Sequence, residues 1–398
     1  MKTQALLEQF TTPELHENHI EMIVFGEDWG GHPSSTQHLI KRLLPAHKIV
    51  WINSLGLRRP TLSLRDGKRV INKLHAMCSP LDAQVIREVQ EQGASDVAPC
   101  QIIAPKSISW PGNPLASQFN RLSLKKQIDE TIARHNFKRP ILWTSLPSAV
   151  DALECYPDYP VVYYCGDDFN ALAGVDHEPV ARMEQRLALR ADLIITASRD
   201  LFERFPSHKT ILLEHGVDYQ HFSTPVSRAP DLPDHPRIAG FYGSLHDWLD
   251  QDMIATTARD LPDWKFVFIG DKHCDTGKLD SLDNIEFLGP RAHSRLPSYV
   301  QHWQASLLPF LDTPQIRACN PLKLREYLSA GKPVISTDFP AARSCGDRVR
   351  LVRSAADLTT ALKAMAAEGP KEAMPDTRMM VQSWENKARL LTDHLLSF

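Results

Sequence analysis

The sequence lacks several features that mark common protein classes. No stretch approaches the roughly 18 apolar residues of a membrane-spanning helix, and the N-terminal residues contain no apolar segment long enough for a signal peptide. The seven cysteines are an odd number and contain no C-x-x-C pair, which favours neither a disulfide framework nor a zinc site. We therefore expect a cytoplasmic protein that works in a reducing compartment.

An excess of charge of one sign is also missing. The chain has 45 Lys and Arg residues against 48 Asp and Glu residues, a net charge of −3, whereas proteins that bind duplex nucleic acid usually show a basic excess. None of the 17 histidines stands in H-x-x-x-H or H-E-x-x-H spacing. We expect no nucleic-acid partner, no metal and no resident cofactor.

What the sequence does contain is an alternation of short apolar runs with helical patterns. The runs IEMIVFGED, KIVWINS, PILWTS, PVVYYCGD and LIITAS come first, and RIAGFYGSL, WKFVFIGD and SLLPF follow. This alternation predicts an α/β protein with parallel, doubly wound sheets. The proline-rich stretch STPVSRAPDLPDHPR is typical of an interdomain linker. We predict four parts: a Rossmann-like domain over residues 1–222, a linker over 223–236, a second Rossmann-like domain over 237–375 and a helical segment over 376–398.

The stretch N-P-L-K-L-R-E-Y-L-S-A-G-K-P-V-I-S-T, residues 320–337, predicts a ten-residue helix followed by a buried strand. Asn320 can cap the first turn with its side-chain oxygen, and Pro321 suits the first helical position. Gly331 can end the helix in the left-handed conformation, and Pro333 prevents the helix from resuming.

Lys323 and Glu326 lie three residues apart in this helix and therefore share a face. The free N–H groups and the positive end of the helix dipole favour an anion such as phosphate, and Lys323 adds a positive charge. Glu326, one turn deeper, can accept hydrogen bonds from a pair of sugar hydroxyls. The alternative is an ordinary amphipathic helix whose Lys and Glu form a surface pair.

The pattern P-x-K-x-x-E-Y-x-x-A-G-x-P-V, which begins at Pro321, resembles the donor-binding segment of glycosyltransferase family 4. Members of that family have the GT-B fold, in which two Rossmann-like domains face each other across a cleft. The resemblance implies that Glu326 holds the ribose of a nucleotide sugar and that Lys323 lies near the diphosphate. Ala318 stands where many members have a Glu that contacts the transferred sugar.

Further donor-binding residues follow from the same resemblance. Gly243 matches the first position of the family motif G-R-L-x-x-x-K-G, but Ser244 replaces its Arg, so the Arg and Lys clamp on the diphosphate is missing. The phosphates must then depend on the helix that begins near Asn320, on Lys323 and on Arg317. Arg291 follows a segment that resembles N-x-x-F-x-G, whose turn borders the nucleotide base.

In the N-terminal half, Gly30, Gly31 and His32 form a loop between a predicted strand and a predicted helix. The loop is not G-x-G-x-x-G, which disfavours a nicotinamide or flavin site. In family 4 the matching loop approaches the donor phosphates and the acceptor, although each glycine can equally serve a tight turn. Asp168 follows another strand, and we expect His32 and Asp168 to act on the acceptor side as catalytic residues.

The resemblance implies a retaining, metal-independent glycosyltransferase of polysaccharide biosynthesis. Such an enzyme moves a sugar from a nucleotide-diphosphate-sugar donor to a saccharide acceptor, lipid-linked saccharides included. Two alternatives stay open. One is a nucleotide-sugar 2-epimerase of the same fold, which needs carboxylates beside the sugar. The other is a catalytically inactive homologue that binds a glycan or a protein partner, because Ala318 and Ser244 remove two common site residues.

The segment SISWPGNPLASQFNRLSLKKQIDETIARHNF, residues 107–137, has apolar residues at near-helical intervals, with basic residues nearby. The apolar residues are Leu115, Phe119, Leu122, Ile128 and Ile132, and the basic ones are Arg121, Lys125 and Lys126. Two readings of this segment are open. In enzymes of the resembling type that act on lipid-linked acceptors, such a surface touches the membrane, which would place the protein at the inner membrane face. Otherwise the segment is a core-facing helix with one wet side.

Overall fold

The computed structural model describes residues 19–31, 34–57, 59, 98–172, 174–369 and 374–398. These residues form two compact units. The first unit takes the described residues within 1–164, 174–193 and 388–398, and the second takes those within 165–173 and 194–387. The domain limits that we predicted at residues 222, 236 and 375 stay predictions.

The first sheet has seven strands in the order β3-β2-β1-β4-β5-β6-β7, which pair in parallel. Most of these strands are apolar and buried, as expected where helices cover both faces of a parallel sheet. The strand order reverses between β1 and β4, and ligands of such sheets bind at the carboxyl ends of the strands beside this reversal. The strands are Glu21–Phe25 (β1), Lys48–Ile52 (β2), Gln101–Ile103 (β3), Ile141–Thr144 (β4), Val161–Cys165 (β5), Leu193–Thr196 (β6) and Thr210–Leu212 (β7).

Local capping explains where the helices of the first unit begin and end. The Ser34 hydroxyl accepts a hydrogen bond from the first turn of α2. Asn113 caps α5 in the same way, with Pro114 at its first position, and Asn136 ends it at a φ of 54°. The helical segments are Ser35–Leu43 (α2), Pro114–His135 (α5), Pro147–Ala149 (the 3₁₀ turn η1), Val150–Leu153 (α6) and His177–Arg190 (α7).

The second sheet has six strands in the order β10-β9-β8-β11-β12-β13, again paired in parallel. Its order reverses between β8 and β11, so a second ligand-binding edge lies at the carboxyl ends of these two strands. The prediction of doubly wound parallel sheets is confirmed. The strands are Ile238–Tyr242 (β8), Lys265–Ile269 (β9), Ile285–Phe287 (β10), Ala305–Leu308 (β11), Val334–Thr337 (β12) and Val349–Val352 (β13).

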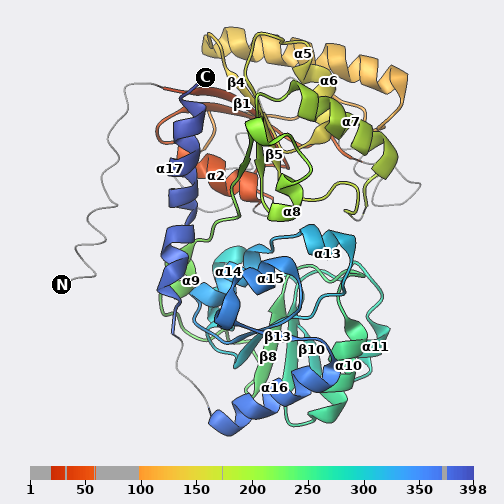
Figure 1. Ribbon diagram of the computed structural model, residues 1–398, viewed down its shortest axis with the longest axis vertical. Helices are drawn as coiled ribbons and strands as arrows, with labels where there is room; N and C mark the ends of the chain where they lie inside the picture. The colour runs from red at the N-terminus through yellow and green to blue at the C-terminus, as the bar shows by residue number, and fades with distance from the viewer. Residues whose placement is uncertain (1–18, 32–33, 58, 60–97, 173, 370–373) are drawn as a thin grey trace, which may run out of the picture. The chain divides into compact units, whose positions relative to one another are not determined.

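Helices flank the second sheet, with α10 and α16 packed side by side (Figure 1). Ser198 caps α8, and Asp250 caps α10. The remaining helices of the described residues are Arg199–Phe202 (α8), Tyr219–Ser223 (α9), Gln251–Asp260 (α10), Gly277–Asp280 (α11), Pro297–Val300 (α12), Pro314–Ala318 (α13), Leu322–Ser329 (α14), Pro340–Ser344 (α15), Ala355–Glu368 (α16) and Trp384–Leu395 (α17). The 3₁₀ turns are Ser207–Lys209 (η2), His293–Arg295 (η3), Gly346–Arg348 (η4) and Thr377–Gln382 (η5).

Helix α14 is the predicted helix of the 320–337 stretch, with a corrected start. It has eight residues and begins at Leu322, with Pro321 at the cap position and no side-chain cap bond, so the predicted cap by Asn320 is wrong. The predicted end is confirmed, because Gly331 has a φ of 74°. A side chain at Gly331 would also lie within 2.4 Å of the Met374 backbone.

Candidate functional site

The loops that follow β8, β9 and β10 are bonded to one another at the carboxyl edge of the second sheet. The N–H of Gly243 donates to the Ile269 carbonyl at 2.8 Å, and the N–H of Gly270 donates to the Gly289 carbonyl at 3.0 Å. Gly243 and Gly270 have φ values of 129° and 148°, a backbone conformation that favours glycine. A Cβ atom on Gly270 would lie 2.1 Å from the Gly243 carbonyl oxygen. At this edge, therefore, Gly243 and Gly270 expose backbone without side chains, close to the point where the strand order reverses.

The ammonium group of Lys323 lies directly over this edge. Its Nζ atom is 2.3 Å from the position that a Cβ atom of Gly243 would take. Lys323 stands in the first turn of α14, which follows β11, whereas Gly243 ends β8. The Lys323 side chain thus extends from the β11 side of the sheet to the end of β8, the two strands between which the strand order reverses. Burial lowers the pKa of Lys323 to about 8, with Glu326 opposing that effect.

The carboxylate of Glu326 lies one turn further along α14 and is held by two side chains. The Tyr242 hydroxyl donates to Oε2 at 2.7 Å, and Nε2 of His293 lies 3.1 Å from Oε1. Burial, together with the nearby Glu326 charge, raises the pKa of the Tyr242 hydroxyl well above its usual value, which keeps it a donor. The Tyr327 hydroxyl accepts from the Tyr242 N–H at 3.0 Å. The orientation of the Glu326 carboxylate is therefore fixed by the surrounding strands and loops.

This arrangement suits a phosphorylated sugar. The N-terminal turn of α14 has no side-chain cap within the described part of the chain and carries the positive end of a helix dipole, and Lys323 adds an ammonium group. Each carboxylate oxygen of Glu326 has a second lone pair, so it can accept a further hydrogen bond from a hydroxyl. The site can hold phosphate at the helix N-terminus and a diol one turn deeper.

The Asn320 side chain bonds to other segments of the chain and does not cap α14. Its side-chain Nδ2 donates to the Ala197 carbonyl at 2.8 Å, and its Oδ1 accepts from the Arg325 guanidinium. Arg325 also bonds to Glu214 at 3.2 Å. Asn320 is 4% exposed, so its polar atoms need these partners. Asn320 and Arg325 therefore anchor the start of α14 to the segments that follow β6 and β7.

The two arginines predicted to bind donor have acidic partners in the structure. Arg317 lies on α13 and pairs with Asp312 through two hydrogen bonds of 2.6 and 2.8 Å. Arg291 donates to Asp231 at 2.6 Å and to the Tyr299 hydroxyl at 3.0 Å. Their roles in donor binding stay predictions, and each would have to share its guanidinium with a carboxylate.

In the first unit, Gly30 and Gly31 lie in the loop between β1 and α2. Gly30 has a φ of 81° and open space where a Cβ atom would stand. The loop is fastened to the residues after β2, because the Trp29 N–H donates to the Asn53 side chain at 3.0 Å. His32 lies outside the described residues. The predicted roles of Gly30, Gly31 and His32 stay predictions.

Asp168 follows β5, as predicted, and its carboxylate is part of an ion pair. Oδ1 lies 2.5 Å from the Arg204 guanidinium and accepts the Asn170 N–H at 3.0 Å. The hydrogen bond to Asp168 raises the pKa of Arg204. Asp168 is 6% exposed, so its present contacts hold the loop together. Its catalytic role stays a prediction.

Sequence reasoning missed the residues that surround Lys323 and Glu326. Tyr242 precedes the Gly243 turn directly, and a strand-end position beside a required glycine was a usable signal. Trp248 stands in the loop after β8 and His293 begins the 3₁₀ turn η3, and no local spacing in the sequence marks either residue. Trp248 follows β8, which is the neighbour of β11, and His293 follows β10, which is separated from β8 by β9 alone, so the parallel sheet brings both residues to the same edge.

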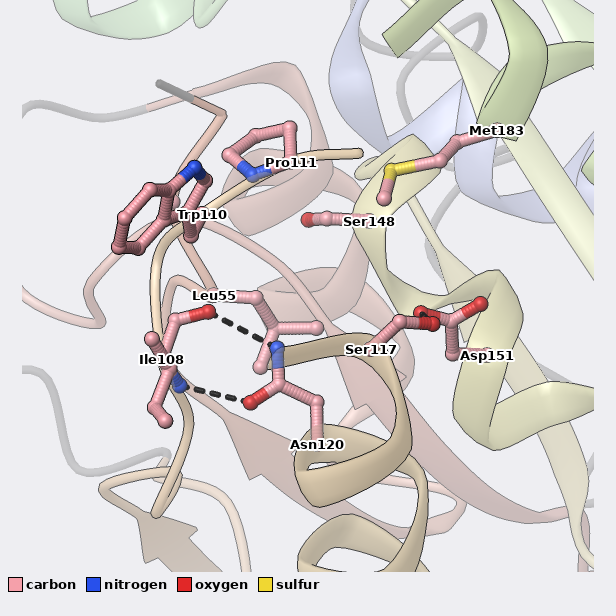
Figure 2. Close-up of a pocket in the computed structure, with 10 residues that line it drawn as sticks. Leu55, Ile108, Trp110, Pro111, Ser117, Asn120, Ser148, Asp151 and Met183 are labelled. Carbon is pink, nitrogen blue, oxygen red and sulfur yellow. Dashed lines mark hydrogen bonds between the residues drawn. The ribbon is translucent and has the colours of Figure 1, made fainter. Parts of the chain in front are cut away.

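The first unit has a hollow with an empty volume of about 310 Å³ (Figure 2). Asn120 bonds both the N–H and the carbonyl of Ile108 at one wall, as the dashed lines show. The Asp151 carboxylate at another wall forms an ion pair with Arg186 at 2.8 Å. It is lined by Leu55, Gly56, Ile108, Trp110, Pro111, Ser117, Asn120, Ser148, Asp151 and Met183.

Within the described part of the chain, no group of three or more His, Cys, Asp or Glu side chains is placed to hold a metal ion. Among the same residues, none of the helices has both the length and the apolar character that crossing a bilayer requires.

Residues 236–368 match the family described as "Glycosyl transferases group 1". A curated protein of Bacillus subtilis (strain 168), named "Putative teichuronic acid biosynthesis glycosyltransferase TuaH", is 30% identical over 246 residues. That alignment covers 56% of this chain and 62% of the Bacillus protein, so the chain spans less than two thirds of this relative.

Solved structures show the same fold over nearly the whole chain. The Anabaena protein Alr3699/HepE in complex with UDP-glucose has a TM-score of 0.65 at 12% identity, covering 96% of this chain and 100% of that one. A Burkholderia xenovorans α,α-trehalose-phosphate synthase in complex with glucose-6-phosphate has a TM-score of 0.60 at 11% identity, covering 95% and 100%. The fold is therefore GT-B, as predicted.

Proposed function

We propose that this protein is a glycosyltransferase of polysaccharide biosynthesis, because residues 236–368 match the family of group 1 glycosyl transferases and the Bacillus relative is named as a glycosyltransferase. It moves a sugar from a nucleotide-diphosphate-sugar to a saccharide acceptor. The observation that carries the proposal is the pair formed by Lys323 and Glu326 at the reversal of strand order, one suited to phosphate and the other to a diol. The UDP-glucose in the Anabaena structure supports a nucleotide-sugar donor.

In the proposed reaction, the chain's work is positioning and electrostatic stabilisation. Charge develops on the diphosphate as the bond to the sugar breaks, and the α14 N-terminus with Lys323 stabilises that charge. Glu326 holds the ribose, which fixes the donor relative to the acceptor. We propose transfer with retention and without a metal, because the resemblance of the 321–334 pattern implies both and Lys323 supplies positive charge at the phosphates.

A donor screen tests this function. Purified protein is incubated with UDP-, GDP- and ADP-sugars, with and without simple saccharide acceptors, and the products are separated by chromatography. We expect one donor to be hydrolysed slowly without acceptor and its sugar to be transferred when acceptor is present. Interconversion of the sugar without transfer would indicate an epimerase instead. Failure of every nucleotide diphosphate to bind by calorimetry would contradict the proposal.

We also propose that the protein is cytoplasmic and touches the membrane surface through an apolar face on and beside α5. Five large apolar side chains of this segment are exposed, by 39% or more of their surface, and we call them the α5 face: Ile108, Trp110, Leu115, Phe119 and Leu122. Leu115 is 78% exposed and Leu122 is 64% exposed, so these two side chains lie on the exposed side of α5. The other side of α5 faces the core, with Leu124 and Ile128 buried, as the alternative of a core-facing helix with one exposed side predicted. An apolar face beside lysines is suited to a bilayer interface.

A vesicle assay tests the membrane proposal. The double variant L115D/L122D should bind vesicles of equal parts phosphatidylcholine and phosphatidylglycerol about tenfold more weakly than wild type, because it removes two exposed apolar side chains and adds negative charge. The matched control is L189D, since Leu189 of α7 is 83% exposed in the same unit but lies outside the α5 face. Co-sedimentation measures the bound fraction. If wild-type protein stays in the supernatant, the membrane proposal is wrong.

A further inference from the structure

Three aromatic rings surround the ammonium group of Lys323. Its Nζ atom lies 4.5 Å from the ring centre of Phe241, 5.5 Å from that of Trp248 and 5.8 Å from that of Phe310. The rings also pack on one another, with edge-to-face contacts of Trp248 and Phe241 on Phe310 at 5.0 and 6.3 Å. We call Phe241, Trp248 and Phe310 the aromatic cage. Phe241 comes from β8, Trp248 from the loop after β8, and Phe310 from the segment after β11.

The Lys323 ammonium has no carboxylate partner within the described part of the chain. No Asp or Glu oxygen there comes within 4.0 Å of Nζ, and Lys323 donates no side-chain hydrogen bond to any described residue. Glu326, the nearest acidic side chain on the same helix, is already bonded to Tyr242 and His293. All three N–H donors of the ammonium are therefore available to a ligand.

A ring face and a carboxylate stabilise an ammonium group in different ways. A carboxylate forms hydrogen bonds, cancels the charge and competes with an incoming phosphate. A ring face attracts the cation through its quadrupole, by about 0.5–2 kcal/mol, and takes none of its N–H donors. The cage thus offsets part of the desolvation that Lys323 experiences, while the positive charge stays available to an anion.

We propose that Trp248, together with the other two rings of the cage, is a positioning residue that keeps Lys323 charged and aimed at the donor diphosphate. The inference rests on the proposed function and deepens it. In this chain Ser244 and buried Leu249 stand where the resembling family has an Arg and a Lys, so the caged Lys323 compensates for two missing cations. Trp248 follows Ser244 in the same loop. In the resembling family this loop supplies cations that contact the diphosphate, whereas here it supplies a ring that contacts Lys323.

Other ionisable groups face Lys323 and would contribute to its titration. Glu326 lies on α14 itself, Cys319 precedes that helix, and His246 lies on the loop after β8. Burial raises the pKa of the Cys319 thiol to about 12, so the thiol is neutral at physiological pH. Burial lowers the pKa of His246, with the neighbouring His273 and Lys323 charges acting in the same direction. Near pH 8, therefore, Lys323 itself is the group expected to change charge.

The test compares W248L with W248F, because leucine removes the ring while phenylalanine keeps one. UDP is the probe, with GDP and ADP as alternatives if one of these is preferred, and titration calorimetry measures the dissociation constant from pH 6.5 to 9. We expect W248L to weaken binding about fivefold at neutral pH and W248F to recover most of that loss. Binding by wild type should fall as pH rises through about 8, and the fall should begin at lower pH in W248L.

A second measurement needs no ligand. Lysines carrying ¹³C-methyl groups are followed by NMR as pH rises, and the Lys323 signal is identified by its absence in K323R. The ring contribution predicts that the Lys323 titration midpoint moves about half a pH unit lower in W248L than in W248F. Circular dichroism checks that each variant is folded.

The outcomes separate the cage from the proposed function. If wild type binds a nucleoside diphosphate but W248L and W248F bind it equally, with equal Lys323 midpoints, the cage proposal is wrong and the glycosyltransferase proposal stands. If wild type binds none of the three diphosphates, the proposed function fails and the role of the cage in donor binding fails with it. A loss of UDP affinity in W248L with an unchanged Lys323 titration midpoint would also contradict the cage proposal.

Discussion

Replacement of Lys323 by alanine is expected to raise the donor Michaelis constant about 50-fold, the largest effect on donor binding that this structure predicts. A charge-assisted hydrogen bond contributes about 1.5–3 kcal/mol, and each 1.4 kcal/mol corresponds to a factor of ten. Ser244 and Leu249 are uncharged, so neither can replace the positive charge of Lys323 at the diphosphate. Initial-rate kinetics with the preferred donor measure the change, and UDP affinity by calorimetry checks it without turnover.

The pH dependence sharpens this prediction. The pKa of Lys323 is lowered to about 8 by burial, so the ammonium is charged below that pH and loses its charge as pH rises through it. Donor affinity of wild type should therefore be high near pH 7 and decline above about 8, while the weak binding by K323A should be flat over the same range. The matched control is K363A, because Lys363 is an exposed lysine of α16 in the same unit. Kinetics of K323A equal to those of K363A would remove the main support for the transferase.

Replacement of Glu326 by glutamine is expected to weaken binding of the nucleoside part about 20-fold. The neutral amide is a weaker acceptor for ribose hydroxyls than a carboxylate, and its NH₂ group cannot accept from Tyr242 or His293. UMP and UDP should lose affinity by the same factor, because both contain the ribose. Inorganic pyrophosphate, which lacks the ribose, should bind wild type and E326Q alike.

The comparison of the two variants assigns each residue to a part of the donor. K323A should affect UDP and pyrophosphate, whereas E326Q should affect UDP and UMP. The control for E326Q is E203Q, since Glu203 lies in the same unit as an exposed partner of Arg199. Thermal melts show whether either variant disturbs folding. Equal losses of UMP and pyrophosphate affinity in E326Q would mean that Glu326 supports the whole site through its Tyr242 and His293 contacts and does not bind ribose.

Local sequence rules were enough to identify α14 and its end. Gly331 and Pro333 act through backbone conformation, which depends on the residue itself and hardly on distant parts of the chain. The shared face of Lys323 and Glu326 follows from helical geometry alone. The alternating pattern likewise predicted parallel doubly wound sheets, because strands buried on both faces must be apolar throughout.

The same rules failed at Asn320 for a physical reason. An asparagine before a helix normally caps it, but here the side chain bonds to Ala197, 123 residues away, and to Arg325. The buried Ala197 carbonyl and the Arg325 guanidinium compete for the polar atoms of Asn320, and they win because a buried group left without a partner costs more than an unmade cap. Neither partner can be recognised from spacing.

By itself, the sequence determined which residues have the chemistry for a donor site: a lysine at a helix N-terminus, a glutamate one turn deeper, and glycines at strand ends. It could not determine what holds them. Phe241, Trp248 and Phe310 meet around Lys323, and Tyr242 and His293 meet at Glu326, only because parallel pairing brings separate strands to one edge of the second sheet. Pairing of that kind depends on contacts between residues far apart in the chain, so the surroundings of the two charges were decided by tertiary structure alone.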